Sequence, residues 1–181
     1  MLFKLCACVC HFEDNKTTID TVIQLLQNNI PLSRIEFLDK RSIKAANDYS
    51  KTELQVKPSL FMEICGNQSD IEPVVEITRE IITENGGAGF QYSVKNEDRS
   101  KIWKARHELY YACKATRPGQ RAIITDVCVP ISKLTDVILQ MNQYIEQYKL
   151  NGTIVIAEIQ FNLIQINQFD ILSHKAIHSD M

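Results

Sequence analysis

The apolar residues of this chain follow two spacings in turn, and that alternation constrains the fold more than any other feature. Short apolar runs and apolar residues at every second position are typical of β-strands, whereas apolar residues three or four apart are typical of helices. Both kinds of stretch recur along most of the chain. This order predicts helices packed on a β-sheet.

Turn and capping residues separate the two kinds of stretch. We expect strands over Leu2–Phe12, Arg34–Leu38, Ser59–Cys65, Phe90–Val94, Ala122–Val129 and from Thr153 to Ala157. We expect helices around Ile19–Ile30, Arg41–Tyr49, Ile71–Ile82, Asn96–Thr116 and, capped by Ser132, Leu134–Tyr148. The repeated strand-helix-strand unit predicts an α/β (α+β) fold, a ferredoxin-like domain with a mixed or antiparallel sheet covered by helices.

Composition narrows the classes of function. The chain has 181 residues and a net charge of −2, which is unlike a general nucleic-acid binder. No apolar run approaches the roughly 20 residues of a membrane span. The segment Met1–Phe12 is too short for a secretory signal and has no Arg, so it predicts no transit peptide. We therefore expect no nucleic-acid partner and no membrane span.

The run Cys6, Cys8 and Cys10 invites a metal-site interpretation. In a strand these residues share one face, with sulfurs about 7 Å apart, which suits burial better than tetrahedral ligation. We expect small buried hydrophobic residues and reduced thiols.

Two other motifs have simpler interpretations. The glycines of Asn85–Gly89 follow a helix, whereas a dinucleotide loop precedes one, so a helix cap and turn is favoured. His174 and His178 are four residues apart but have no third ligand at a diagnostic spacing. No metal site and no His-based catalytic set are predicted.

Trp103, Arg106 and Tyr110 fall on one face of the helix expected over Asn96–Thr116. An arginine on such a face is costly unless its charge is met, and a carboxylate ligand held by both arms of the guanidinium would meet it. Alternatively the arginine lays its stem on the core and reaches water. The residues alone favour this second interpretation.

Four segments are similar to those of FAD-linked D-lactate dehydrogenases, flavoproteins of the vanillyl-alcohol-oxidase type. They occur in that family's order and spacing and cover roughly residues 5 to 155. The segments are Arg34–Asp39, Arg99–His107, Ala115–Gly119 and Thr125–Ser132.

The resemblance implies a cap domain that builds the substrate pocket over a flavin held mainly by a separate N-terminal domain. It implies that the complete enzyme oxidises D-lactate or another D-2-hydroxy acid, giving pyruvate from D-lactate, with hydride passing to FAD. It also implies a cytochrome c-type electron acceptor and a mitochondrial location. Arg106 is implied as the substrate-carboxylate clamp, and we add Tyr110 and Arg117 as candidate substrate-binding residues.

The chain departs from the family in two respects. The FAD domain is absent, and after Val155 the family continues into G-H-V-G-D-G-N-F-H, which supplies divalent-metal histidines and a base. We therefore expect an incomplete cap domain over residues 1–155, a non-matching tail over 156–181, and a lost metal site. Such a fragment has no catalytic residue of its own and is expected to be inactive alone, with a partly exposed apolar sheet face or edge. A non-catalytic α/β binding or interaction module is the alternative.

Overall fold

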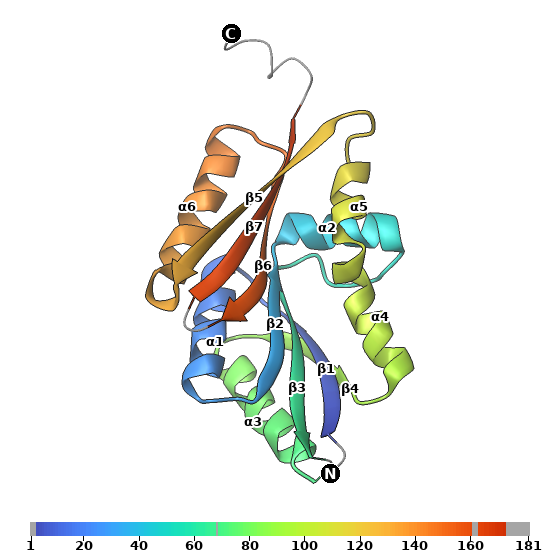
Figure 1. Ribbon diagram of the computed structural model, residues 1–181, viewed down its shortest axis with the longest axis vertical. Coiled ribbons are helices and arrows are strands. Elements are labelled where there is room, and N and C mark those ends of the chain that lie inside the picture. Colours follow the sequence, from blue (N-terminus) through green and yellow to red (C-terminus); the bar gives the residue numbers. More distant parts are fainter. Residues whose placement is uncertain (1–2, 68, 161–162, 173–181) are drawn as a thin grey trace.

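The computed structural model describes residues 3–67, 69–160 and 163–172 (Figure 1). The strands are β1 (Phe3–His11), β2 (Leu32–Leu38), β3 (Ser59–Asn67), β4 (Ala88–Ser93), β5 (Arg121–Pro130), β6 (Gly152–Gln160) and β7 (Leu163–Leu172). The helices are α1 (Asn15–Gln27), α2 (Lys40–Ser50), α3 (Ile71–Glu84), α4 (Asn96–His107), α5 (Leu109–Ala115) and α6 (Leu134–Gln147), with a 3₁₀ turn, η1, at Ile131–Lys133.

The strands form one sheet in the order β4-β1-β3-β2-β6-β7-β5, with antiparallel neighbours throughout. The first four strands have the 4-1-3-2 order of a ferredoxin-like unit, in which α1 and α3 provide the crossovers. The predicted fold, a helix-covered sheet of ferredoxin-like type, is confirmed. The sheet is antiparallel, which settles the alternative that the sequence left open.

Helices cover both faces of this sheet (Figure 1). Helices α1, α3 and α6 lie on one face, over a core that contains Cys6, Cys8 and Cys10. All three cysteines are fully buried, so the prediction of small buried hydrophobic residues is confirmed. The alternate residues Ala7 and Val9 point to the other face, because successive side chains of a strand alternate.

Helices α2, α4 and α5 cover the second face, which carries the candidate site. Its core joins Leu38 of β2 and Phe61 of β3 to Trp103 of α4 and Leu109 of α5. The single helix predicted over Asn96–Thr116 is wrong, because the chain breaks at Glu108 between α4 and α5. The break lets α4 cover β1 while α5 packs on α2.

Two other local predictions have opposite outcomes. Gly86 follows α3 with φ +77°, and the Gly87 N–H bonds the Ile82 carbonyl, which confirms the helix cap and turn. Ser132 was expected to cap the next helix, but it lies within the 3₁₀ turn, and Lys133 is the N-cap of α6. Pro130 fixes the backbone where β5 ends and the turn begins.

The predicted exposed apolar edge is present on β5, the edge strand next to β7. Ile123, Ile124 and Val127 each expose more than two-fifths of their surface. Beyond residue 156, β6 continues and β7 pairs with both β6 and β5 along its length, so β7 lies inside the sheet.

His174 and His178 lie outside the described residues. Within the described part of the chain, no helix is long and apolar enough to cross a membrane.

Candidate functional site

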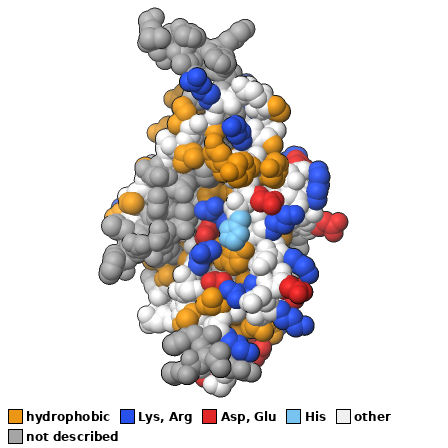
Figure 2. Space-filling view, turned by 45° about the vertical axis from the view of Figure 1, so that its right-hand side comes forward, with side chains coloured by type: hydrophobic (Ala, Val, Ile, Leu, Met, Phe, Trp, Pro, Cys, Tyr) orange, Lys and Arg blue, Asp and Glu red, His pale blue; other side chains and the backbone are white. Residues whose placement is uncertain are grey.

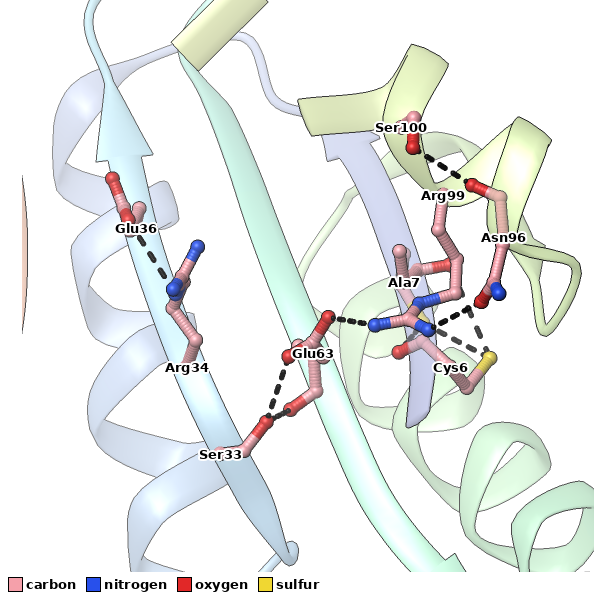
Figure 3. A network of polar contacts seen from close by, with 10 residues as sticks. Cys6, Ala7, Ser33, Arg34, Glu36, Glu63, Asn96, Arg99 and Ser100 are labelled. Carbon is pink, nitrogen blue, oxygen red and sulfur yellow. Dashed lines mark hydrogen bonds and ion pairs between the residues drawn. The ribbon is translucent and has the colours of Figure 1, made fainter. Parts of the chain in front are cut away.

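A polar group interrupts the otherwise apolar face of the sheet beneath α4. Arg34 and Glu36 of β2 point to this face, and Glu63 of β3 lies directly opposite Arg34 in the strand register. The alternation of side chains along a strand places all three on the same side as Phe61. The hydroxyl of Ser33 donates to Glu63, which ties the two strands together at this point (Figure 3).

Helix α4 brings two more arginines to this group. Arg99 Nη2 donates to Glu63 Oε2 over 2.8 Å, and Arg106 Nε donates to Glu36 Oε2. Arg99 also bonds the side chain of Asn96 in the first turn of the helix (Figure 3). Glu63 and Glu36 are therefore each paired with one arginine of the helix.

Arg34 has the weakest charge compensation of the three arginines. Its Nε is 3.9 Å from Glu36 Oε1, and that carboxylate already accepts from Arg106. Its guanidinium carbon lies 4.8 Å from the centre of the Trp103 ring, in a cation–π contact, and 46% of the side chain is exposed. Three arginines face two glutamates, so the group has one surplus positive charge, and it belongs to Arg34.

A cavity of about 390 Å³ opens beside these residues. Trp103 is only 4% exposed, yet its indole Nε1 has no hydrogen-bond partner among the described residues, and the same holds for Arg99 Nε. Figure 2 shows basic and acidic side chains gathered in the middle of this face, with apolar side chains above them. The cavity is lined by Arg34, Glu63, Asn96, Arg99, Ser100, Trp103 and His107.

This lining is suited to a small anion. A carboxylate would meet the surplus charge of Arg34, whose side chain is 46% exposed. Burial raises the pKa of Glu36 above its ordinary value, although the nearby charges of Arg106 and Arg34 oppose that shift.

The family of FAD linked oxidases, C-terminal domain, matches residues 5–164 of the chain. The chain belongs to this family. It is 39% identical over 151 residues to "Probable D-lactate dehydrogenase, mitochondrial" of Danio rerio, covering 83% of this chain and 30% of that protein. It is 32% identical to "D-lactate dehydrogenase [cytochrome], mitochondrial" of Arabidopsis thaliana, covering 81% of this chain and 26% of that protein. The chain therefore spans less than a third of either relative.

Solved structures share the fold at low sequence identity. A p-cresol methylhydroxylase aligns with a TM-score of 0.70 at 12% identity, over 97% of this chain and 39% of that one. An alkyldihydroxyacetonephosphate synthase aligns with a TM-score of 0.67 at 10% identity, over 98% and 37%. These likenesses concern the fold alone.

The family match ends within β7, and the division into residues 1–155 and 156–181 stays a prediction.

The structure of this FAD-linked oxidase C-terminal domain separates the three predicted substrate-binding residues. A clamp free for a ligand carboxylate would have no carboxylate partner in the protein, but Arg106 Nε donates to Glu36, so the expectation of a free Arg106 clamp is wrong. Tyr110, at the start of α5, packs edge-to-face on Tyr111. Arg117 is exposed in the turn after α5. None of the three lines the cavity beneath α4, and their role in binding substrate stays a prediction.

The residues that sequence reasoning missed are Arg34, Arg99 and the indole N–H of Trp103. They stand in two of the segments that carry the family resemblance, so the signal was present. The helical spacing of Trp103, Arg106 and Tyr110 drew attention to the wrong arginine. Only the strand register, which sets Arg34 opposite Glu63, brings the other two arginines together.

A second cavity, of about 510 Å³, lies between α2, α5 and the start of β6. Its cationic residues already have partners: Arg41 bonds Asn142 of α6, and Lys44 pairs with Asp48. Burial raises the pKa of the Cys113 thiol on its wall to about 11, so this thiol stays protonated. Nothing in this lining indicates a particular ligand.

The described residues do not supply a flavin phosphate loop. The glycines at 86–89 close α3 and lead into β4, whereas a dinucleotide loop would open a helix. No cluster of three or more His, Cys, Asp or Glu side chains that could hold a metal ion occurs among the described residues.

Proposed function

We propose that this chain is the substrate-capping part of a flavin-dependent D-2-hydroxy acid dehydrogenase that oxidises D-lactate to pyruvate. Membership of the FAD-linked oxidase family and the D-lactate dehydrogenase names of two relatives support this proposal. Because the chain spans under a third of those relatives, the activity is that of a longer protein. We place it in mitochondria with a cytochrome c-type acceptor, as the names of these relatives suggest.

The observation that carries the proposal is the donor-lined cavity beneath α4. In the complete enzyme, the substrate carboxylate would bind Arg34 beside the Trp103 ring, while Arg99 stays fixed on Glu63. A carboxylate held by the planar fork of a guanidinium has a fixed orientation, which sets the direction of its hydroxyl carbon. FAD, when bound mainly by the rest of the protein, supplies the hydride acceptor.

The remaining candidates have supporting roles in this proposal. Arg106 does not line the cavity; it pairs with Glu36, which also lies next to Arg34, and so affects the charge available at Arg34. Tyr110 and Arg117 lie further along the same stretch of chain and are proposed to contact the rest of the substrate. A divalent metal at the hydroxyl would need ligands beyond the described residues.

A segment exchange tests the proposal. The part of the Danio rerio relative that matches this chain is replaced by residues 5–155, and cytochrome c reduction is measured with D-lactate and with L-lactate. We expect a flavin-containing chimera that oxidises D-lactate in preference to L-lactate. A chimera with full flavin content that oxidises no D-2-hydroxy acid would contradict the proposal. The 181-residue chain alone should bind no flavin, and a yellow purified chain would contradict that part.

Two variants of the chimera test the cavity. Arg34→Gln should raise KM for D-lactate about tenfold or more, since a hydrogen bond to a charged group contributes roughly 1.5–3 kcal/mol. Arg79→Gln is the matched control, because Arg79 lies on α3 over the opposite face of the sheet. Equal KM values for the two variants would exclude Arg34 from the site.

A further inference from the structure

Glu36 is a buried carboxylate that lies behind the cavity without lining it. Only 7% of its side chain is exposed, and it sits at the position of β2 two residues beyond Arg34. Its two oxygens face different arginines: Oε2 accepts from Arg106 of α4, and Oε1 lies 3.9 Å from Arg34 of the same strand. Among the ion pairs of the described residues, Glu36 is the one carboxylate shared by both arginines.

The charges that act on Glu36 are those of Arg34 on its own strand and of Arg106 on α4. Beside them, Glu63 of β3 pairs with Arg99 of α4. Arg99 is committed to Glu63 at 2.8 Å, so Arg34 and Arg106 divide the single charge of Glu36. A ligand carboxylate at Arg34 would therefore meet a guanidinium that Glu36 already partly neutralises.

We propose that Glu36 is a resident carboxylate that competes with the ligand carboxylate for Arg34 and so limits the affinity of the cavity for anions. This inference rests on the proposed carboxylate site and adds a residue that sets its strength. Glu36 is a positioning residue: it acts through Arg34 and Arg106 and touches no substrate. By holding Arg34 when the cavity is empty, it also provides a partner to which Arg34 returns when an anion leaves.

If Glu36 competes with the ligand, removing its charge should increase the affinity of the cavity for D-lactate. Glu36→Gln keeps the shape of the side chain and an oxygen that can accept from Arg106, but removes one negative charge next to the cavity. Two unit charges at about 8 Å interact strongly enough, at an effective dielectric constant of ~20, to change an affinity about 30-fold. Because the cavity opens to solvent, we expect D-lactate to bind the variant about five- to tenfold more tightly. A purely structural role would weaken binding.

The test uses the 181-residue chain with D-lactate as the probe. Binding is followed through the ¹⁵N–¹H signals of arginine Nε and of the Trp103 indole, the one tryptophan of the chain. Glu13→Gln is the control, since Glu13 carries the same charge but is highly exposed and pairs with Lys57 away from the cavity. We expect tighter binding in Glu36→Gln, a steeper dependence on chloride concentration, and wild-type values in the control.

The outcomes separate this inference from the proposed function. If a folded Glu36→Gln chain binds D-lactate no more tightly than the wild type, the proposed competition is overturned. If the wild-type chain nevertheless binds D-lactate in the same titration, the proposed carboxylate cavity is still supported. If neither chain binds D-lactate, the competition and the cavity both fail, and D-lactate oxidation by the chimera still tests the wider function. Should Glu36→Gln not fold, the ¹³C carboxyl signal of Glu36 is followed in the wild type. That signal must shift on D-lactate addition, and its constancy overturns the inference.

Discussion

The ion pair between Arg106 and Glu36 leads to a sharp prediction about stability and pH. Both partners are largely buried, with side chains 21% and 7% exposed. Arg106→Gln leaves the Glu36 carboxylate in the same buried position with only Arg34 near it, at 3.9 Å. An unpaired buried carboxylate is costly, whereas a protonated one is much less so.

The size of the effect depends on the protonation of Glu36. Breaking a buried ion pair by removing one partner costs about 3–5 kcal/mol. Because Arg34 remains and Arg106 is partly exposed, we expect about 2–3 kcal/mol at pH 7.5 and ~1 kcal/mol or less near pH 4. The loss should lower the melting temperature by about 5–10 °C at pH 7.5 for a chain of this length.

The sign of the pH dependence follows from the pKa of Glu36, which burial raises above its ordinary value. A carboxyl group with a raised pKa stabilises the folded state at pH values below its ordinary pKa. That stabilisation is lost as the pH rises through the pKa of the folded state. Arg106→Gln removes a charge that lowers this pKa, so the loss becomes larger and extends to higher pH. The difference between wild type and variant should therefore grow from pH 4 towards neutrality.

Urea unfolding at several pH values between 4 and 7.5 measures this difference. The double variant Glu36→Gln/Arg106→Gln should recover most of the stability at pH 7.5, because the one charge it leaves without a partner, Arg34, is 46% exposed. Arg79→Gln, on the opposite face and 42% exposed, should change the free energy of unfolding by no more than about 0.5 kcal/mol at any pH. A cost for Arg106→Gln that does not change with pH would refute the assignment of a buried charge pair.

Two further predictions concern the turn after α3 and the edge strand. Gly87→Ala should cost about 2–3 kcal/mol, because its Cβ would lie 2.4 Å from Ile82 Cγ2 and 2.8 Å from Phe12 Cε1. A Cβ at Gly86 would meet no atom within 4 Å, but the backbone there has φ +77°, so Gly86→Ala should cost about 1–2 kcal/mol. Urea unfolding measures both costs, and a larger cost for Gly86→Ala than for Gly87→Ala would contradict this order. The exposed apolar residues of β5 should bind a hydrophobic dye, and Ile124→Asp should reduce the signal; a monomeric wild-type chain that binds no dye would count against an exposed patch.

The elements of this fold follow closely from local sequence signals. Turn residues and apolar spacing place α2 within one residue of its predicted ends, and the alternation of β1 correctly buries Cys6, Cys8 and Cys10. The break at Glu108 could not be predicted in this way. The residues on either side favour a helix, and the break lets α4 cover β1 while α5 packs mainly on α2.

The candidate site was harder to predict, because its charge balance depends on contacts between distant segments. Helical spacing correctly indicated that Arg106 faces the sheet, but Glu36 is 70 residues away in sequence and its side of β2 depends on strand pairing. Arg34 and Glu36 look like ordinary alternating surface charges of a strand. Only the helix that covers this face makes Glu36 the buried partner of Arg106 and leaves Arg34 beside the Trp103 ring.

The arrangement beneath α4 makes physical sense as a site held ready for an anion. A lone arginine over an aromatic ring would be mobile, and a fully paired one would have little attraction left for a ligand. Here Glu63 fixes Arg99, Glu36 fixes Arg106, and Arg34 is held loosely by Glu36 and by the Trp103 ring. The protein thus keeps one guanidinium in place, only partly neutralised and beside an open cavity, where a carboxylate can reach it.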